Sequence, residues 1–202
     1  MLLCGWVDSL SARFVDAFLT SLFALALAEI GDRPQILCAA LAIRFGRVAP
    51  VLWGLGLATL VNCFISAFFG QAIHQWISED PLQLFYALSL LLAGIGMLAW
   101  RRPVDLLEKW TLNPILISFL GLLILQFGDK GQFILAATAA RTDMWLFAAL
   151  GGWLGVMIAC VPALLLQEKL AQMIPIDRIR QGGALLFLLI GGFLALGAWG
   201  II

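Results

Sequence analysis

The sequence predicts an all-α integral membrane protein whose six transmembrane helices form two inverted three-helix repeats. Of its 202 residues, 63% are hydrophobic and only 12% are charged. A soluble domain of this size does not need so much apolar surface, so we expect the bilayer to be its solvent. The apolar residues gather in six long stretches, and the chain resembles itself at one fixed offset.

Each of the six stretches is long enough to cross the hydrocarbon core, for which a helix needs about 20 residues. Four of them contain no charged residue, whereas the first and the fourth each contain a charged motif. The connections between the stretches are short, which leaves no room for a soluble domain. The expected spans are residues 17–43, 48–73, 82–100, 114–140, 144–166 and 182–202.

A shift of 97 positions aligns the two halves of the chain without a gap. Chance easily matches Leu and Ala in membrane sequences, but here polar residues and glycines match in the same register. The expected units are residues 1–100, a linker of residues 101–113, and residues 114–202. The matching pairs include Ser21/Ser118, Gly31/Gly128, Asp32/Asp129, Gln35/Gln132, Arg44/Arg141, Gly54/Gly151, Cys63/Cys160 and Gly94/Gly191.

Each half contains three expected spans, and this odd number makes the second half enter the membrane upside down relative to the first. Secondary transporters use such inverted repeats, and they bind substrate near the midplane where the halves meet. A fusion that merely enlarged the bundle would not explain why the charged residues match best.

Two charged motifs lie at equivalent places in the first and fourth spans. A charge at the centre of a membrane helix costs roughly 2.5–3.5 kcal/mol on insertion scales, so we expect these residues to be functional. Residues three or four apart share one face of a helix, which would bring the acidic side chains of a motif together. The motifs are Glu29-Ile30-Gly31-Asp32-Arg33-Pro34 and Gln126-Phe127-Gly128-Asp129-Lys130-Gly131.

Together the motifs predict a site for a divalent cation. Glu29, Asp32 and Asp129 supply carboxylates and Gln126 supplies an amide oxygen. Hard cations such as Ca²⁺ and Mn²⁺ prefer oxygen ligands of this kind. Supporting or proton-coupling roles are expected for Arg33, Lys130, Gln35 and Gln132.

Breaks in the backbone are expected at the motifs. Pro34 cannot donate a hydrogen bond to the carbonyl of Ile30, which releases that oxygen beside the carboxylates. Glycine permits local unwinding, and unwound backbone is tolerated at membrane depth where it lines a cavity. The other residues expected at these breaks are Gly31, Gly128 and Gly131.

Protons and metal ions compete for carboxylate oxygens, so this site would exchange one for the other. The pattern therefore favours a cation/proton antiporter. A structural alternative is that Arg33 and Lys130 only neutralise the acids in a buried network that fixes helix register. Buried ion pairs are weak evidence for stability, however, because desolvation can exceed the Coulomb gain.

The Lys and Arg residues of the loops predict the orientation. Eight lie on one side and two on the other, which places the first set in the cytoplasm and both termini outside. The net charge of zero does not indicate a nucleic-acid partner, and the four cysteines form no C-x-x-C pair that would hold a metal cofactor. The cytoplasmic set is Arg44, Arg47, Arg101, Arg102, Lys109, Lys169, Arg178 and Arg180, against Arg13 and Arg141.

The two motifs resemble the E-x-G-D-[KR]-[ST] signature that occurs once in each half of the GDT family of calcium/manganese–proton antiporters. Glu29, Asp32 and Arg33 match the first copy, and Asp129 and Lys130 match the second. The resemblance covers nearly all of the chain. It implies transport of Mn²⁺ or Ca²⁺ across a bacterial inner membrane, with manganese export as in bacterial members.

The chain departs from the family pattern in two respects. Gln126 stands where the family has a second Glu, which removes one negative charge and one protonatable group. Pro34 and Gly131 replace hydroxyl residues. The site is therefore expected to be asymmetric.

Two other functions are compatible with parts of the pattern. An intramembrane aspartyl protease also places two Asp residues in neighbouring spans, but its dyad must share a proton, whereas Arg33 and Lys130 would favour two ionised carboxylates. An exporter of a basic amino acid or another organic cation is the other alternative. It is disfavoured because the site already contains its own cations.

Overall fold

The computed structural model describes residues 2–99 and 103–199, and the regular structure of these residues is entirely helical. This confirms the expected all-α fold. The expected span ends at Trp100 and Ile202, and the loop residues Arg101 and Arg102, lie outside the described residues. The helices are α1 (Leu2–Glu29), α2 (Arg33–Phe45), α3 (Val48–His74), α4 (Glu79–Ala99), α5 (Pro114–Gln126), α6 (Lys130–Thr142), α7 (Trp145–Leu166), α8 (Glu168–Met173) and α9 (Ile176–Ala198).

Five helices are long and apolar enough to cross a membrane, namely α1, α3, α4, α7 and α9. The pair α5 and α6 passes the same test together, although the two helices meet at an angle of 68°. Many large apolar side chains on these helices are exposed, such as Trp53, Phe68 and Phe193. A surface of this kind suits lipid, and the chain is a multi-pass membrane protein.

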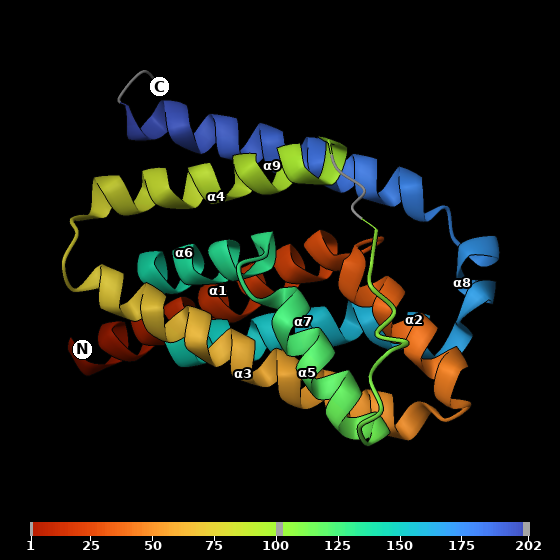
Figure 1. The fold of residues 1–202 in the computed structure, drawn as a ribbon. Helices are drawn as coiled ribbons and strands as arrows, with labels where there is room; N and C mark the ends of the chain where they lie inside the picture. The colour runs from red at the N-terminus through yellow and green to blue at the C-terminus, as the bar shows by residue number, and fades with distance from the viewer. Residues whose placement is uncertain (1, 100–102, 200–202) are drawn as a thin grey trace.

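The long helices run side by side, with α4 packed along α9 and α1 packed along α7, while α3 contacts α5, α6 and α7 (Figure 1). The start of α1 and the end of α9 lie at the same end of the bundle, on the left in Figure 1, which we call the terminal end. The α3–α4 and α6–α7 connections also lie there. The α2–α3 connection, residues 103–113 and α8 lie at the opposite end, which we call the linker end.

The first and fourth expected spans are each divided into two helices. Gly31 and Gly128 have positive φ angles of 73° and 72°, and each lies in the short turn that separates the two helices. Pro34 lies in the first turn of α2, where its missing N–H costs no helical hydrogen bond. The proline therefore helps to start a helix after the break.

The helix boundaries recur with the offset found in the sequence. We call residues 97 positions apart counterparts. Helices α1 and α5 end at the counterparts Glu29 and Gln126, and the following helices begin at the counterparts Arg33 and Lys130. The later helices also begin at counterparts, Val48 and Trp145 for α3 and α7, and Glu79 and Ile176 for α4 and α9.

Counterparts do not always have the same surroundings. The guanidinium of Arg44, at the end of α2, donates to the carbonyl oxygens of Leu107, Glu108 and Trp110 at 2.6, 3.3 and 2.9 Å. It thereby fastens the linker to α2. Its counterpart Arg141 instead forms an ion pair with Asp16 at the terminal end, with an N–O distance of 3.1 Å. The repeated arginine thus serves different contacts in the two halves.

Two counterpart glycines allow helices to approach closely. A Cβ atom on Gly54 of α3 would lie 2.4 Å from the Cβ of Ser118 on α5. A Cβ atom on Gly151 of α7 would lie 2.2 Å from the carbonyl oxygen of Phe18 on α1. Both distances are far below van der Waals contact, so these two interfaces depend on the missing side chain.

We predict that Gly151→Ala lowers the free energy of unfolding by about 1–3 kcal/mol, because a methyl group must displace the backbone of α1. Gly56→Ala is the matched control on the neighbouring helix, since no atom lies within 4 Å of its added Cβ. That change should be neutral or stabilising by up to about 1 kcal/mol, as expected for Gly→Ala in a helix. Thermal unfolding in detergent measures both, and equal midpoints for the two variants would contradict the packing described.

Candidate cation-binding site

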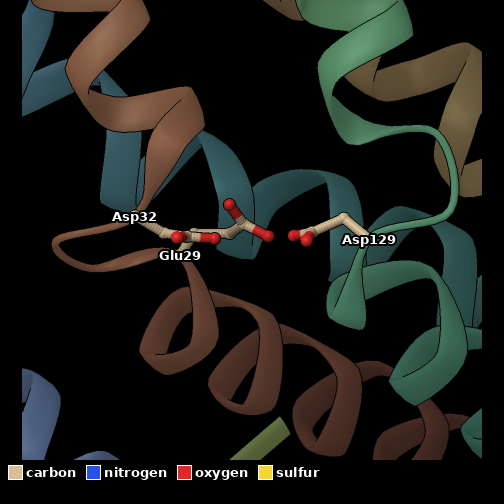
Figure 2. A group of neighbouring side chains, drawn as sticks. All are labelled: Glu29, Asp32 and Asp129. Carbon is tan, nitrogen blue, oxygen red and sulfur yellow. The ribbon is translucent and has the colours of Figure 1, made fainter. Parts of the chain in front are cut away.

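The two helix breaks bring three carboxylates together. Glu29 ends α1, Asp32 is the N-cap of α2, and Asp129 is the N-cap of α6. Figure 2 shows their side chains pointing toward one another, and one oxygen of each lies within 4.8 Å of the others. Glu29 is 3% exposed, whereas the side chains of Asp32 and Asp129 are partly accessible. The structure therefore brings together the three predicted carboxylates.

The residue spacing predicted that the acids of a motif share one face of a helix, and this prediction is wrong. The helix ends at Glu29, and Asp32 has extended backbone angles of φ −101° and ψ 174°. Asp129 likewise has extended angles at the start of α6. The turns at Gly31 and Gly128 therefore orient the acids.

Two ion pairs cross between the halves of the chain. The guanidinium of Arg33 lies 3.0 Å from Oδ1 of Asp129. The ammonium of Lys130 contacts Asp32 and lies 3.4 Å from Oδ2 of Asp129. Each cation thus pairs with the aspartate of the other half, and Lys130 bridges both aspartates. These crossed ion pairs neutralise much of the negative charge of the three acids.

Glu29 retains an unsatisfied oxygen. Its Oε2 is buried and has no hydrogen-bond partner, which is costly for a carboxylate unless a ligand compensates it. Gly131 lies beside the other oxygen, since a Cβ atom there would be 2.9 Å from Oε1 of Glu29. The glycine thus leaves space around a carboxylate that could ligate a cation.

Gln35 and Gln132 act on the turns and not on the carboxylates. Their Oε1 atoms accept hydrogen bonds from the N–H groups of Gly31 and Gly128, at 2.7 and 2.8 Å. The Nε2 atom of Gln35 donates to the carbonyl of Ala159 at 2.7 Å, and that of Gln132 donates to Oδ1 of Asn62 at 2.8 Å. Each glutamine therefore ties a helix break to the other half of the chain.

Gln126 is buried, and α3 holds it through two polar residues. Its Oε1 accepts from Nδ2 of Asn62 at 3.2 Å, and its Nε2 donates to the hydroxyl of Thr59 at 3.1 Å. Sequence reasoning did not assign Thr59 or Asn62 to the site. The available signal was two polar residues three positions apart in a span without charges.

Two cavities meet at the carboxylate cluster. The larger one, about 790 Å³, reaches Asp32 and Asp129 from the linker end, between the helix breaks and the start of α9. The smaller one, about 20 Å³, lies beside Glu29 and Gln126. Asp129 lines both cavities. The carboxylate of Asp129 thus lies between the two cavities.

The larger cavity coincides with a difference between the halves. In the part of the chain that the structure describes, α4 packs along α6, whereas its counterpart α9 makes few contacts with α2. Residues of both α2 and α9 line the cavity, including Arg33 and Arg178. The space between these two helices therefore opens the site toward the linker end.

Comparisons with known proteins point to one family. The family model described as "Divalent cation/proton antiporter GDT1" matches residues 17–103 and residues 114–201. A protein of Vibrio cholerae serotype O1 that is named "Putative manganese exporter" is 34% identical over an alignment of 176 positions, and the alignment covers 84% of this chain and 85% of that protein. No solved structure matches the chain.

We predict that alanine destabilises the two break glycines unequally. The left-handed conformation costs an L-residue about 1–2 kcal/mol, which is the full penalty for Gly128→Ala because no atom lies within 4 Å of its added Cβ. Gly31→Ala should cost more, because its Cβ would also lie 2.7 Å from Cγ2 of Ile176. Thermal unfolding of the two variants in detergent tests this order, and a more stable Gly31→Ala protein would contradict it.

Proposed function

The chain belongs to the divalent cation/proton antiporter GDT1 family, and from this premise we propose that it exports Mn²⁺ in exchange for protons. The family membership confirms the resemblance that the two motifs indicated. It makes the protein a membrane ion transporter, which supports transport over the protease alternative. We propose Mn²⁺ in preference to Ca²⁺ because the Vibrio cholerae relative carries the name "Putative manganese exporter".

The observation that carries the proposal is the convergence of Glu29, Asp32 and Asp129 within 4.8 Å. Three hard oxygen donors in one cluster suit a divalent cation of the Mn²⁺ or Ca²⁺ type. Gln126 lines the adjoining small cavity and could add a neutral oxygen if its bond to Asn62 is given up. An organic cation is disfavoured because Arg33 and Lys130 already place a guanidinium and an ammonium beside these carboxylates.

Arg33 and Lys130 would act as tethered competitors of the metal. Lys130 contacts Asp32 and Asp129, so Mn²⁺ that binds between these acids must displace its ammonium. Protons compete for the same oxygens, because metal binding requires deprotonated carboxylates. After the metal leaves, protons and the two cations together neutralise the acids. The emptied site could then return to the membrane face from which it takes up the metal.

We propose that the two three-span units are inverted repeats and that the site alternates between the two membrane faces. The recurring helix boundaries, the crossed ion pairs and the two matched segments of the family model support this duplication. The larger cavity would be the open access route in this conformation. The excess of Lys and Arg near the linker end supports a cytoplasmic assignment for it, with both termini outside a bacterial inner membrane.

We expect Asp32→Asn and Asp129→Asn each to remove most of the stabilisation by Mn²⁺, because each deletes one of three charged ligands. Mn²⁺ at about 100 times its Kd should stabilise the parent protein by about 2.7 kcal/mol. Glu108→Gln, a change of an exposed carboxylate in the linker, is the control and should behave as the parent does. Thermal unfolding in detergent with and without Mn²⁺ measures this.

Growth of a Mn²⁺-sensitive deletion strain that carries each variant tests the same residues in cells. Full rescue of this strain by both Asn variants would contradict the site.

Proton coupling predicts that Mn²⁺ accumulates in proteoliposomes with an acidic lumen, because protons that leave down their gradient drive the metal inward. A protonophore that collapses the gradient should abolish this accumulation. The Asp32→Asn/Asp129→Asn double variant serves as the inactive control, and Ca²⁺ measured in parallel tests selectivity. Mn²⁺ flux that is indifferent to the pH gradient would refute the exchange.

A further inference from the structure

Helix α3 carries a polar face that its counterpart α7 lacks. Thr59, Asn62 and Ser66 follow one another at spacings of three and four residues, so they lie on one side of the helix. All three are at least nine-tenths buried. Their counterparts on α7 are all apolar, namely Val156, Ala159 and Ala163. The polar face is therefore a property of one half of the protein, and the duplication does not account for it.

These three side chains line the smaller cavity together with Glu29. Its volume of about 20 Å³ accommodates one water molecule or one small ion. The cavity extends from the carboxylates toward the terminal end. Helix α3 runs in that direction from Asn62 to Ser66, and Leu135 lies farther along α6 than Gln132 in the same direction (Figure 1).

Two buried side-chain oxygens in the described part of the chain have no hydrogen-bond partner. One is Oε2 of Glu29, a residue that lines the small cavity. The other is Oε1 of Gln71, farther along α3 toward the terminal end. The Nε2 atom of Gln71 donates to Oδ1 of Asp143 at 2.6 Å, which adds an acidic group there. Buried oxygens are thus present both at the carboxylate cluster and near the end of α3, on different sides of that helix.

A tight contact between α3 and α6 lies between the cavity and the end of α3. A Cβ atom on Gly70 would lie 2.2 Å from the carbonyl oxygen of Ala136 and 2.9 Å from the Cβ of Ala139. Because Gly70 lies between Ser66 and Gln71, the two helices must separate there before an ion can pass. The small cavity is thus closed on this side, whereas the large cavity is open on the other.

We propose that the cavity beside Thr59, Asn62 and Ser66 is a second subsite for the divalent cation, which the ion occupies after it leaves Asp32 and moves past Asp129 toward the terminal end. This inference rests on the proposed function and adds to it the exit route. Hydroxyl and amide oxygens are hard ligands without charge. They replace part of the hydration shell while holding the ion less strongly than carboxylates do, which suits a site that an ion must leave.

The first test gives α3 the residues of its counterpart. In the variant Thr59→Val/Asn62→Ala/Ser66→Ala, the three carboxylates and two cations are unchanged. We expect Mn²⁺ flux in proteoliposomes to fall by about tenfold or more, because an ion in the cavity would lose its neutral ligands. The stabilisation by Mn²⁺ in detergent should persist, because the aspartates still bind the ion. Ser118→Ala removes a buried hydroxyl that donates to the carbonyl of Pro114 outside both cavities, and it should leave the flux near the parental value.

The outcomes separate the exit route from the proposed function. Parental flux in the triple variant would overturn the exit route alone. Equal losses of flux and of stabilisation by Mn²⁺ would also overturn it, because they would show that α3 only shapes the carboxylate cluster. A parent protein that neither binds nor transports Mn²⁺ would overturn the proposed function and the exit route with it.

A second test labels a cysteine that the chain already contains in this cavity. Cys63 lines the small cavity, whereas its counterpart Cys160 is fully buried on α7. Methyl methanethiosulfonate adds a methylthio group to a thiol and should inhibit Mn²⁺ flux by filling the cavity during transport. Cys63→Ser should abolish this inhibition and Cys160→Ser should preserve it. Unimpaired flux after treatment of the parent during turnover, or inhibition that persists in Cys63→Ser, would overturn the subsite.

Discussion

Arg33 pairs with Asp129 and Lys130 pairs with Asp32, and these crossed ion pairs allow five charged side chains to lie within an apolar helix bundle. Unpaired charges at this depth would be costly, so the two halves must stay together to keep each cation beside its carboxylate. The helix breaks follow from the same requirement, because the turns at Gly31 and Gly128 place the cations across the interface. The glutamine bonds to these turns hold the geometry in place.

The two halves share a framework and differ in what they place around it. Counterpart residues form the breaks, the crossed ion pairs and the close glycine contacts. The differences lie around this framework, where α9 leaves space beside α2 and α3 carries polar residues opposite Glu29. Gln126 also differs from its counterpart Glu29. Thr59 and Asn62 form hydrogen bonds with the amide of Gln126, whereas Glu29 has an oxygen without a hydrogen-bond partner. In the proposed transport cycle, ion access and ion exit would thus depend on departures from symmetry.

Much of the candidate site could be predicted because the chain repeats its charged motifs at one offset. Glu29, Asp32 and Asp129 were expected to converge, and they do so in the structure. The pairing of Arg33 with the opposite half could not be read from helical spacing, since the helix ends at Glu29 and the periodicity stops there. Similarly, Thr59 and Asn62 look like ordinary interhelical hydrogen-bond partners until Gln126 is placed beside them. Contacts between segments far apart in the sequence decide both cases.

The two cations beside the carboxylates also determine how the membrane voltage acts on the protein. With all five side chains ionised, the empty cluster carries one net negative charge, and a bound divalent cation reverses its sign. An electrical potential therefore acts in opposite directions on the empty and the loaded forms, with about 2.3 kcal/mol for each elementary charge moved through 100 mV. Without Arg33 and Lys130 the empty cluster would carry three negative charges. In the proposed exchange cycle, the crossed ion pairs would thus limit the electrical work of returning the emptied site.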